Sequence, residues 1–148
     1  MNLIRLFHAA QLHELDIHPK ALRLITQNLK RIDAGLRADP EANRLFLEIL
    51  TSRKDPEIAL RRMNEAGVFG RFVPDFGRVV AQMQYDMYHV HTVDEHTLFA
   101  IGILSKIESG ALKEDHPVST AVIRTIVSRP VLSSHSRTVP SAPDEART

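Results

Sequence analysis

The fold is decided by two neighbouring stretches, Asp39-Pro-Glu-Ala-Asn-Arg-Leu-Phe-Leu-Glu-Ile-Leu50 and Asp55-Pro-Glu-Ile-Ala-Leu-Arg-Arg-Met-Asn-Glu-Ala-Gly67. Each begins with Asp-Pro, in which the proline suits a first helical turn and the aspartate can cap the helix. The apolar residues that follow recur at helical spacing, so each stretch predicts a helix with one buried face. Those residues are Ala42, Leu45, Phe46, Ile49 and Leu50 in the first stretch, and Ala59, Leu60 and Met63 in the second. Gly67 is a plausible C-cap for the second helix.

The same periodicity extends in both directions along the chain. A helix is predicted over residues 3–15, with a stripe through Leu3, Phe7, Ala10 and Gln11. Another starts at His18-Pro19 and places Leu22, Ile25, Leu29 and Ile32 on one face. Residues 67–75 break the pattern and predict a turn or short connector, and a short helix is expected over 76–85.

Further on, the stretch 86–91 has few helix signals, and a new helix then begins at a recognisable start signal. Thr92 stands three residues before Glu95, which is the spacing of a capping box. We expect this helix to run to Ser109 and to stop at Gly110, and a last helix to cover residues 118–127. No strand alternation of useful length is present, so the chain is predicted to be all-α.

Composition excludes several classes of protein. The chain has 148 residues, 43% of them hydrophobic and 25% charged, which is ordinary for a soluble globular domain. A net charge of +1 without a concentrated Lys/Arg run argues against nucleic acid as a partner. No apolar stretch approaches a membrane span, and no cysteine is present to form a disulfide or thiolate metal site. We expect no membrane association and a cytoplasmic location.

The last sixteen residues, 133–148, are rich in serine, proline and arginine and contain a single large apolar residue, Val139. Such a segment cannot bury enough surface to offset the entropy lost on ordering, so it is predicted to be disordered.

Most of the candidate chemistry lies in the histidines. Five of them are expected to be exposed or locally hydrogen-bonded. The spacing of His8, His13 and His18 fits no helix or strand face, and His116 and His135 lie in loop-like or disordered contexts. In an extended 86–91 segment His89 and His91 would point to the same side, but neither stands at i, i+4 spacing with His96.

His96 is the strongest single candidate. It shares a predicted helix face with Phe99, Ala100, Ile103 and Ile107, so its imidazole is expected to point into the interior. Spacing alone favours a hydrogen-bonded core histidine over a metal ligand.

Other polar side chains favour structural roles. Asp94 and Glu95 are interpreted as first-turn charges that the helix dipole stabilises, not as catalytic carboxylates. Three basic residues, Arg61, Arg62 and Arg71, are interpreted as solvated surface positions.

Three segments resemble the bifunctional [protein-PII] uridylyltransferase/uridylyl-removing enzymes of bacterial nitrogen regulation. The most specific is Phe76-Gly-Arg-Val-Val-Ala-Gln-Met-Gln-Tyr-Asp-Met-Tyr-His-Val-His-Thr-Val-Asp-Glu-His-Thr97, which is similar to the family's entry into its HD phosphohydrolase domain. Upstream, Asn2-Leu-Ile-Arg-Leu-Phe-His-Ala-Ala10 and Leu24-Ile-Thr-Gln-Asn-Leu29 look like the helical region between the nucleotidyltransferase and HD domains. The resemblance covers residues 1–132.

The resemblance implies both a division of the chain and a function. Residues 1–75 would be the helical connector, 76–132 the start of an incomplete HD domain and 133–148 a non-homologous tail. Such enzymes use UTP to uridylylate PII protein, hydrolyse UMP from uridylyl-PII and sense glutamine. In their HD domains a first histidine, a His-Asp pair and a later aspartate hold Mg²⁺ or Mn²⁺, and His96 matches the first ligand.

The remaining ligands of that site are missing from this sequence, because no His-Asp dipeptide occurs anywhere in it. Where the family continues toward His-Asp, this chain reads Ser133-Ser-His-Ser136. One choice of codons for these residues, read one base out of register, encodes Ile-Ala-Leu. We therefore hypothesise that a frameshift or truncation produced the tail, which resequencing the locus would test.

Three readings of the function remain open. The first is an internal fragment of the PII-modifying enzyme that is inactive in isolation. The second is a non-catalytic helical module that binds PII or packs against other domains, and the third is an unrelated all-α domain with a core histidine. In either of the first two, the helices over 97–109 and 118–127 are expected to expose apolar faces, with the first 70 residues better ordered.

Overall fold

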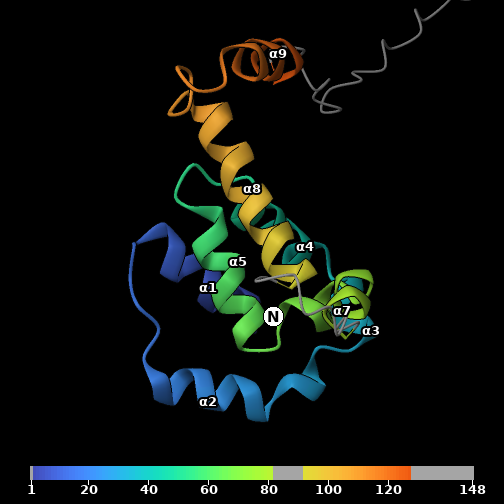
Figure 1. Ribbon diagram of the computed structural model, residues 1–148. Coiled ribbons are helices and arrows are strands. Elements are labelled where there is room, and N and C mark those ends of the chain that lie inside the picture. The colour runs from blue at the N-terminus through green and yellow to red at the C-terminus, as the bar shows by residue number, and fades with distance from the viewer. Residues whose placement is uncertain (1, 82–91, 128–148) are drawn as a thin grey trace, which may run out of the picture.

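The computed structural model describes residues 2–81 and 92–127, and these residues form helices without any strand, as predicted (Figure 1). The predicted disordered tail at 133–148 and the segment 86–91 lie outside the described residues. The helices, in chain order, are α1 (Asn2–Leu12), α2 (Pro19–Gln27), the 3-10 helix η1 (Leu29–Arg31), α3 (Ala34–Ala38), α4 (Pro40–Leu50), α5 (Pro56–Glu65), α6 (Phe69–Phe72), α7 (Pro74–Ala81), α8 (Val93–Ser109) and α9 (Pro117–Val127).

Helix α5 is the centre of the packing. It contacts α1, α4, α6 and α8, and Leu60 and Met63 on its inner face are completely buried. Helices α1 and α4 also pack on each other, so α1, α4 and α5 form a three-helix group (Figure 1). Helix α8 crosses α5, and α9 contacts α8 beyond that crossing.

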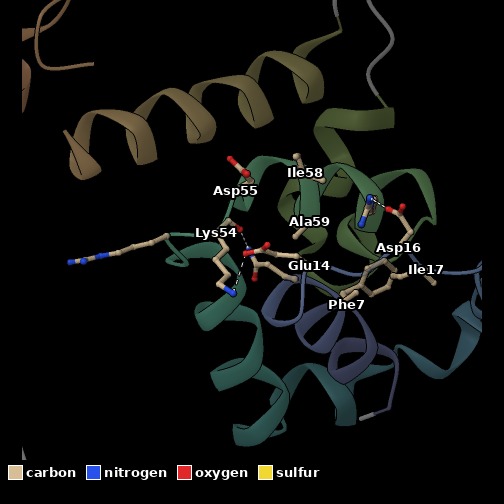
Figure 2. A pocket seen from close by; sticks show the side chains of 12 residues that line it. Phe7, Glu14, Asp16, Ile17, Lys54, Asp55, Ile58 and Ala59 are labelled. Atoms are coloured by element: carbon tan, nitrogen blue, oxygen red, sulfur yellow. Dashed lines mark hydrogen bonds and ion pairs between the residues drawn. The ribbon is translucent and has the colours of Figure 1, made fainter. Parts of the chain in front are cut away.

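The two Asp-Pro helix starts differ in how they are capped. The Asp39 carboxylate accepts a hydrogen bond from the Ala42 backbone N–H at 2.8 Å, as predicted for α4. The predicted Asp55 cap is wrong, because this residue adopts a left-handed conformation (φ 36°) and its side chain makes no capping hydrogen bond. Figure 2 shows its carboxylate turned away from the neighbouring side chains. Asp55 is the last residue of the five-residue connection between α4 and α5, and its backbone conformation there does not follow the capping preference.

The helix after Pro19 ends earlier than the apolar periodicity suggests. Ile25 and Ile32 are buried as predicted, but α2 stops at Gln27 and the chain continues as η1. Asn28 follows the last helical residue, and its side-chain amide donates to the Leu24 carbonyl oxygen at 2.7 Å. A side chain that satisfies the backbone in this way competes with helix continuation.

The stretch 67–75 is not a simple connector. Gly67 has a φ of 71°, and its N–H and that of Val68 donate back to Asn64 and Met63, which is a Schellman ending for α5. The chain then enters α6 and α7, where a Cβ on Gly77 would lie 2.3 Å from the Gly70 carbonyl oxygen. The predicted short helix is present as α7, although it begins at Pro74 and residues 82–85 lie outside the described part.

Four phenylalanines join α4 to α6 and α7. Phe46 lies 5.6 Å from Phe69 and 5.2 Å from Phe72, measured between ring centroids, with tilted planes. Phe69 and Phe76 stack at 4.0 Å. Phe76 and Leu98 belong to the same core as the residues of α1, α4 and α5. The described residues on both sides of position 75 therefore share one core, while the predicted domain boundary there stays a prediction.

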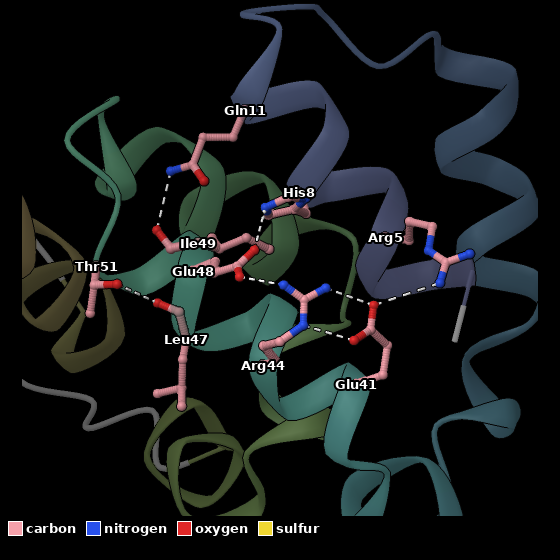
Figure 3. A network of polar contacts seen from close by, with 9 residues as sticks. All are labelled: Arg5, His8, Gln11, Glu41, Arg44, Leu47, Glu48, Ile49 and Thr51. Atoms are coloured by element: carbon pink, nitrogen blue, oxygen red, sulfur yellow. Dashed lines mark hydrogen bonds and ion pairs between the residues drawn. The ribbon is translucent and has the colours of Figure 1, made fainter. Parts of the chain in front are cut away.

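A polar network covers the seam between α1 and α4 (Figure 3). Arg44 donates two hydrogen bonds of 2.8 Å to Glu41 and also pairs with Glu48, while His8 Nε2 lies 2.9 Å from Glu48. Hydrogen bonds from Arg44 are the largest cause that lowers the pKa of the Glu41 carboxyl. Because these charges are largely solvent-exposed, the network specifies the pairing of the helices more than it stabilises them.

The Gly67→Ala change is expected to destabilise the fold by about 1–2 kcal/mol. Alanine disfavours the left-handed backbone that Gly67 adopts, and its Cβ would lie 3.0 Å from a methyl carbon of Leu29. Gly110→Ala is the matched control for the backbone conformation, since Gly110 is also left-handed, with a φ of 85°. Urea unfolding should show a larger loss for the Gly67 variant. Equal losses would mean that contact with Leu29 contributes nothing.

Candidate functional site

Helix α8 begins and ends where the sequence predicts. The capping box is present, and the Thr92 backbone N–H donates to the Glu95 carboxylate at 3.3 Å. Its C-cap is Gly110, whose left-handed backbone stops the helix after Ser109. The start of α8 is therefore well defined, and it places His96 in the first turn.

The prediction that His96 points into the interior is wrong, because its side chain is exposed. Phe99 and Ala100, which share its face, are exposed as well, and Phe99 retains 55% of its accessible surface. The helix buries Leu98, Gly102 and Ile107, so only the far end of the predicted face, at Ile107, is buried. Residues 98–104 in the middle of α8 are apolar or glycine on every side, so their spacing alone could not identify the side that packs on α5.

The described residues do not supply a metal site. Within 2–81 and 92–127, no group of three or more His, Asp or Glu side chains is arranged to hold a metal ion. His89 and His91 lie outside the described residues. The described part of the chain therefore does not by itself fit the Mg²⁺ or Mn²⁺ that the family resemblance implies, and the ligand role of His96 stays a prediction.

The acidic residues beside His96 hold α8 in place. The Asp94 carboxylate accepts a hydrogen bond from the Asn64 side chain of α5 at 2.8 Å, which joins the two helices. Burial raises the pKa of Asp94, but hydrogen bonds from Thr92, from Asn64 and from the backbone N–H groups of the first turn outweigh it, so the pKa is lowered. This arrangement agrees with the interpretation of Asp94 and Glu95 as first-turn charges.

A pocket that the sequence did not reveal lies between α1 and α5 (Figure 2). Its volume is about 420 Å³, and its walls combine apolar side chains with three acidic and three basic ones. Lys54 Nζ lies 3.1 Å from the Glu14 carboxylate and donates to the Leu12 carbonyl oxygen at 2.9 Å. On the other side Arg62 pairs with Asp16.

These contacts join the end of α1 and the loop that follows it to α5 and to the connection between α4 and α5. Gln11 donates to the carbonyl oxygens of Ile49 and Lys54, at 3.2 and 2.9 Å, and so ties α1 to the connection between α4 and α5. Arg62 is half-buried and engaged here, so its interpretation as a solvated position is wrong. The partners lie more than 35 residues apart in the chain, and no local sequence pattern signals them.

The remaining candidates have the following positions. Arg61 pairs with Glu57 at 2.8 Å within α5, so it is not simply solvated, while Arg71 is exposed as predicted. His18 is locally hydrogen-bonded as predicted, because its Nδ1 accepts from the Lys20 N–H at the start of α2. None of the helices formed by residues 2–81 and 92–127 has the length and apolar character needed to cross a membrane.

Asp94→Asn is expected to cost about 1 kcal/mol of stability near neutral pH, since a hydrogen-bonded negative charge at a helix start is lost. A lowered folded-state pKa gives stability that is present above the ordinary value of 3.8 and is lost as the pH falls through the folded value. The difference from the parent chain should therefore shrink in acid, as urea unfolding at several pH values would show. Asp75→Asn is the control, because Asp75 is highly exposed; an equal effect there would contradict the assignment.

Comparison with known proteins places the chain in a family. Residues 1–72 match the family model described as the third domain of uridylyltransferase GlnD. No solved structure matches the chain.

Three curated relatives share one printed name, bifunctional uridylyltransferase/uridylyl-removing enzyme. The chain is 70% identical to the protein from Azospirillum brasilense, 58% to that from Novosphingobium aromaticivorans and 55% to that from Rhodospirillum rubrum. Each match covers 132 residues, which are 89% of this chain and 14% of the relative. The length of the match equals the extent of the predicted resemblance, and the chain spans about a seventh of the length of these relatives. Over these residues the chain belongs to the family of bifunctional uridylyltransferase/uridylyl-removing enzymes.

Proposed function

We propose that this chain is a segment of an enzyme that transfers UMP from UTP to the PII signalling protein and removes it again. The observation that carries this proposal is the 70% identity over 132 residues to a protein of that printed name. The complete enzyme would respond to glutamine and act in the cytoplasm, with neither nucleic acid nor membrane as a partner.

Within that enzyme, the segment would act as a helical connector that leads into an HD phosphohydrolase domain. The shared core supports this role, because Leu98 of α8 packs in the same cluster as Leu60 of α5 and Phe7 of α1. The hydrogen bond between Asn64 and Asp94 adds a polar tie at the same junction. The first turn of α8 is thereby held at a fixed position relative to the first 72 residues.

His96 would be one ligand of an Mg²⁺ or Mn²⁺ ion, and the other ligands would come from outside the described residues. A single exposed imidazole competes poorly with water for a hard divalent cation, which prefers oxygen ligands. We therefore expect the 148-residue chain alone to have negligible uridylyltransferase or uridylyl-removing activity.

A second candidate function is a non-catalytic module that binds PII or packs against other domains. The observation that favours it is a set of exposed apolar side chains on α8 and α9, namely Phe99, Leu104, Val118 and Val122. Each retains more than half of its accessible surface. Binding of PII by the purified chain, without release or transfer of UMP, would support this candidate over the first.

Titration of the purified chain with Mn²⁺ by calorimetry should give no binding above background, either for the parent or for His96→Ala. Tight binding that is lost in His96→Ala would contradict the proposal, because it would mean that this chain completes a metal site.

In a full-length relative, the same change at the matching histidine should abolish removal of UMP from uridylyl-PII and leave transfer from UTP intact. A change at the position of His13, which is exposed and follows α1, is the matched control. If the variant at the His96 position still hydrolyses UMP from uridylyl-PII, the proposed role of His96 as a metal ligand is wrong.

A further inference from the structure

The segment from Pro19 to Ala38 carries an excess of positive charge. It holds five basic residues and one acidic residue, Asp33, so its net charge is +4, whereas that of the whole chain is +1. Four of the basic residues are exposed: Lys20, Arg23, Lys30 and Arg31. None of these four lies within ion-pair distance of a carboxylate among the described residues, although six other Lys and Arg side chains there do.

These charges lie on the outer side of the α2–η1 segment, which we call the basic face and define by Lys20, Arg23, Lys30 and Arg31. Helix α2 buries Ile25 against the body, and Lys20 and Arg23 lie away from that side. Leu24, beside Arg23, retains 61% of its accessible surface. Helix α2 borders the molecule at the bottom of Figure 1, so this face is open to a partner.

A groove of about 460 Å³ runs between α2 and the last turn of α5, next to the basic face. Pro19, Leu22 and Ala66 give it an apolar lining, which suits an aliphatic side chain of a partner. Its charged lining residues are Arg23, Arg62 and Glu65. Arg62 is already paired with Asp16, which leaves Arg23 as the cation at the groove without a carboxylate partner among the described residues.

We propose that the basic face and this groove bind an acidic polypeptide segment of a protein partner. An aliphatic side chain of that segment would occupy the groove, and its carboxylates would pair with Arg23 and with Lys20 and Arg31. Charge complementarity is the reason for this choice, because carboxylates form strong charge-assisted hydrogen bonds with guanidinium groups.

Two other polyanions fit this surface less well. No Phe, Tyr or Trp occurs between residues 17 and 38, so the face lacks the large aromatic rings on which nucleic-acid bases stack best. Leu24 is the one large apolar side chain that α2 leaves mostly exposed, too little for an amphipathic helix that inserts into an anionic membrane.

The test is fluorescence anisotropy with a labelled peptide of alternating glutamate and leucine, titrated with the full chain. The variant K20E/R23E/R31E should weaken binding by about tenfold or more, while the control R53E/R71E/K106E should change it by about twofold or less. The control residues are exposed and unpaired cations of the described chain, and the two variants have equal net charge. Added salt should weaken binding, and so should serine in place of leucine in the peptide.

Absence of peptide binding would overturn the proposal, and so would equal weakening by both variants, which would indicate a response to net charge alone. Tighter binding of a uridine oligonucleotide or of phosphatidylserine vesicles would overturn it in favour of that ligand. Circular dichroism establishes whether each variant is folded. If K20E/R23E/R31E is unfolded, K20Q/R23Q/R31Q, with neutral side chains at the three positions, takes its place. This variant should also weaken peptide binding, and unchanged binding would contradict the proposal.

Discussion

The burial of Leu60 and Met63 on the inner face of α5 is the interaction on which the rest of the structure depends. Both side chains are fully excluded from solvent, and α5 contacts α1, α4, α6 and α8. Burying two such side chains is worth about 3–6 kcal/mol, which is comparable to the whole stability of a small domain. Without that packing the Asn64–Asp94 and Gln11–Lys54 hydrogen bonds would have no fixed geometry, because each joins α5 or its preceding loop to another helix.

Most of this architecture could be predicted from local signals in the sequence. The capping box at Thr92, the stop at Gly110 and the proline starts of α2, α4 and α5 all act within one helical turn, so the sequence around them is sufficient. The errors occur where distant contacts decide. The stretch 67–75 contains α6 because Phe69 and Phe72 can reach the core, whereas Asp55 is left-handed against its capping preference.

In the candidate site, too, local sequence predicts some features and distant contacts decide the others. The position of His96 in the first turn of α8 followed from the capping signal, whereas its exposure depends on which side of the helix meets α5, and residues 98–104 are apolar or glycine all round. The contacts of Gln11, Lys54 and Arg62 join residues more than 35 positions apart, so no sequence periodicity could reveal them. Family membership depended on the sequence as a whole, because the match runs over 132 residues and not over one motif.

The central claim is that one core joins the first 72 residues to the first half of α8. Hydrogen exchange followed by mass spectrometry, on the parent chain and on Leu60→Ala, tests it most directly. If the claim is right, the substitution lowers protection by the same free energy in α1, α4 and the part of α8 around Leu98, while α9 changes little. Unchanged protection around Leu98 would contradict it, because α8 would then be folding independently of α5.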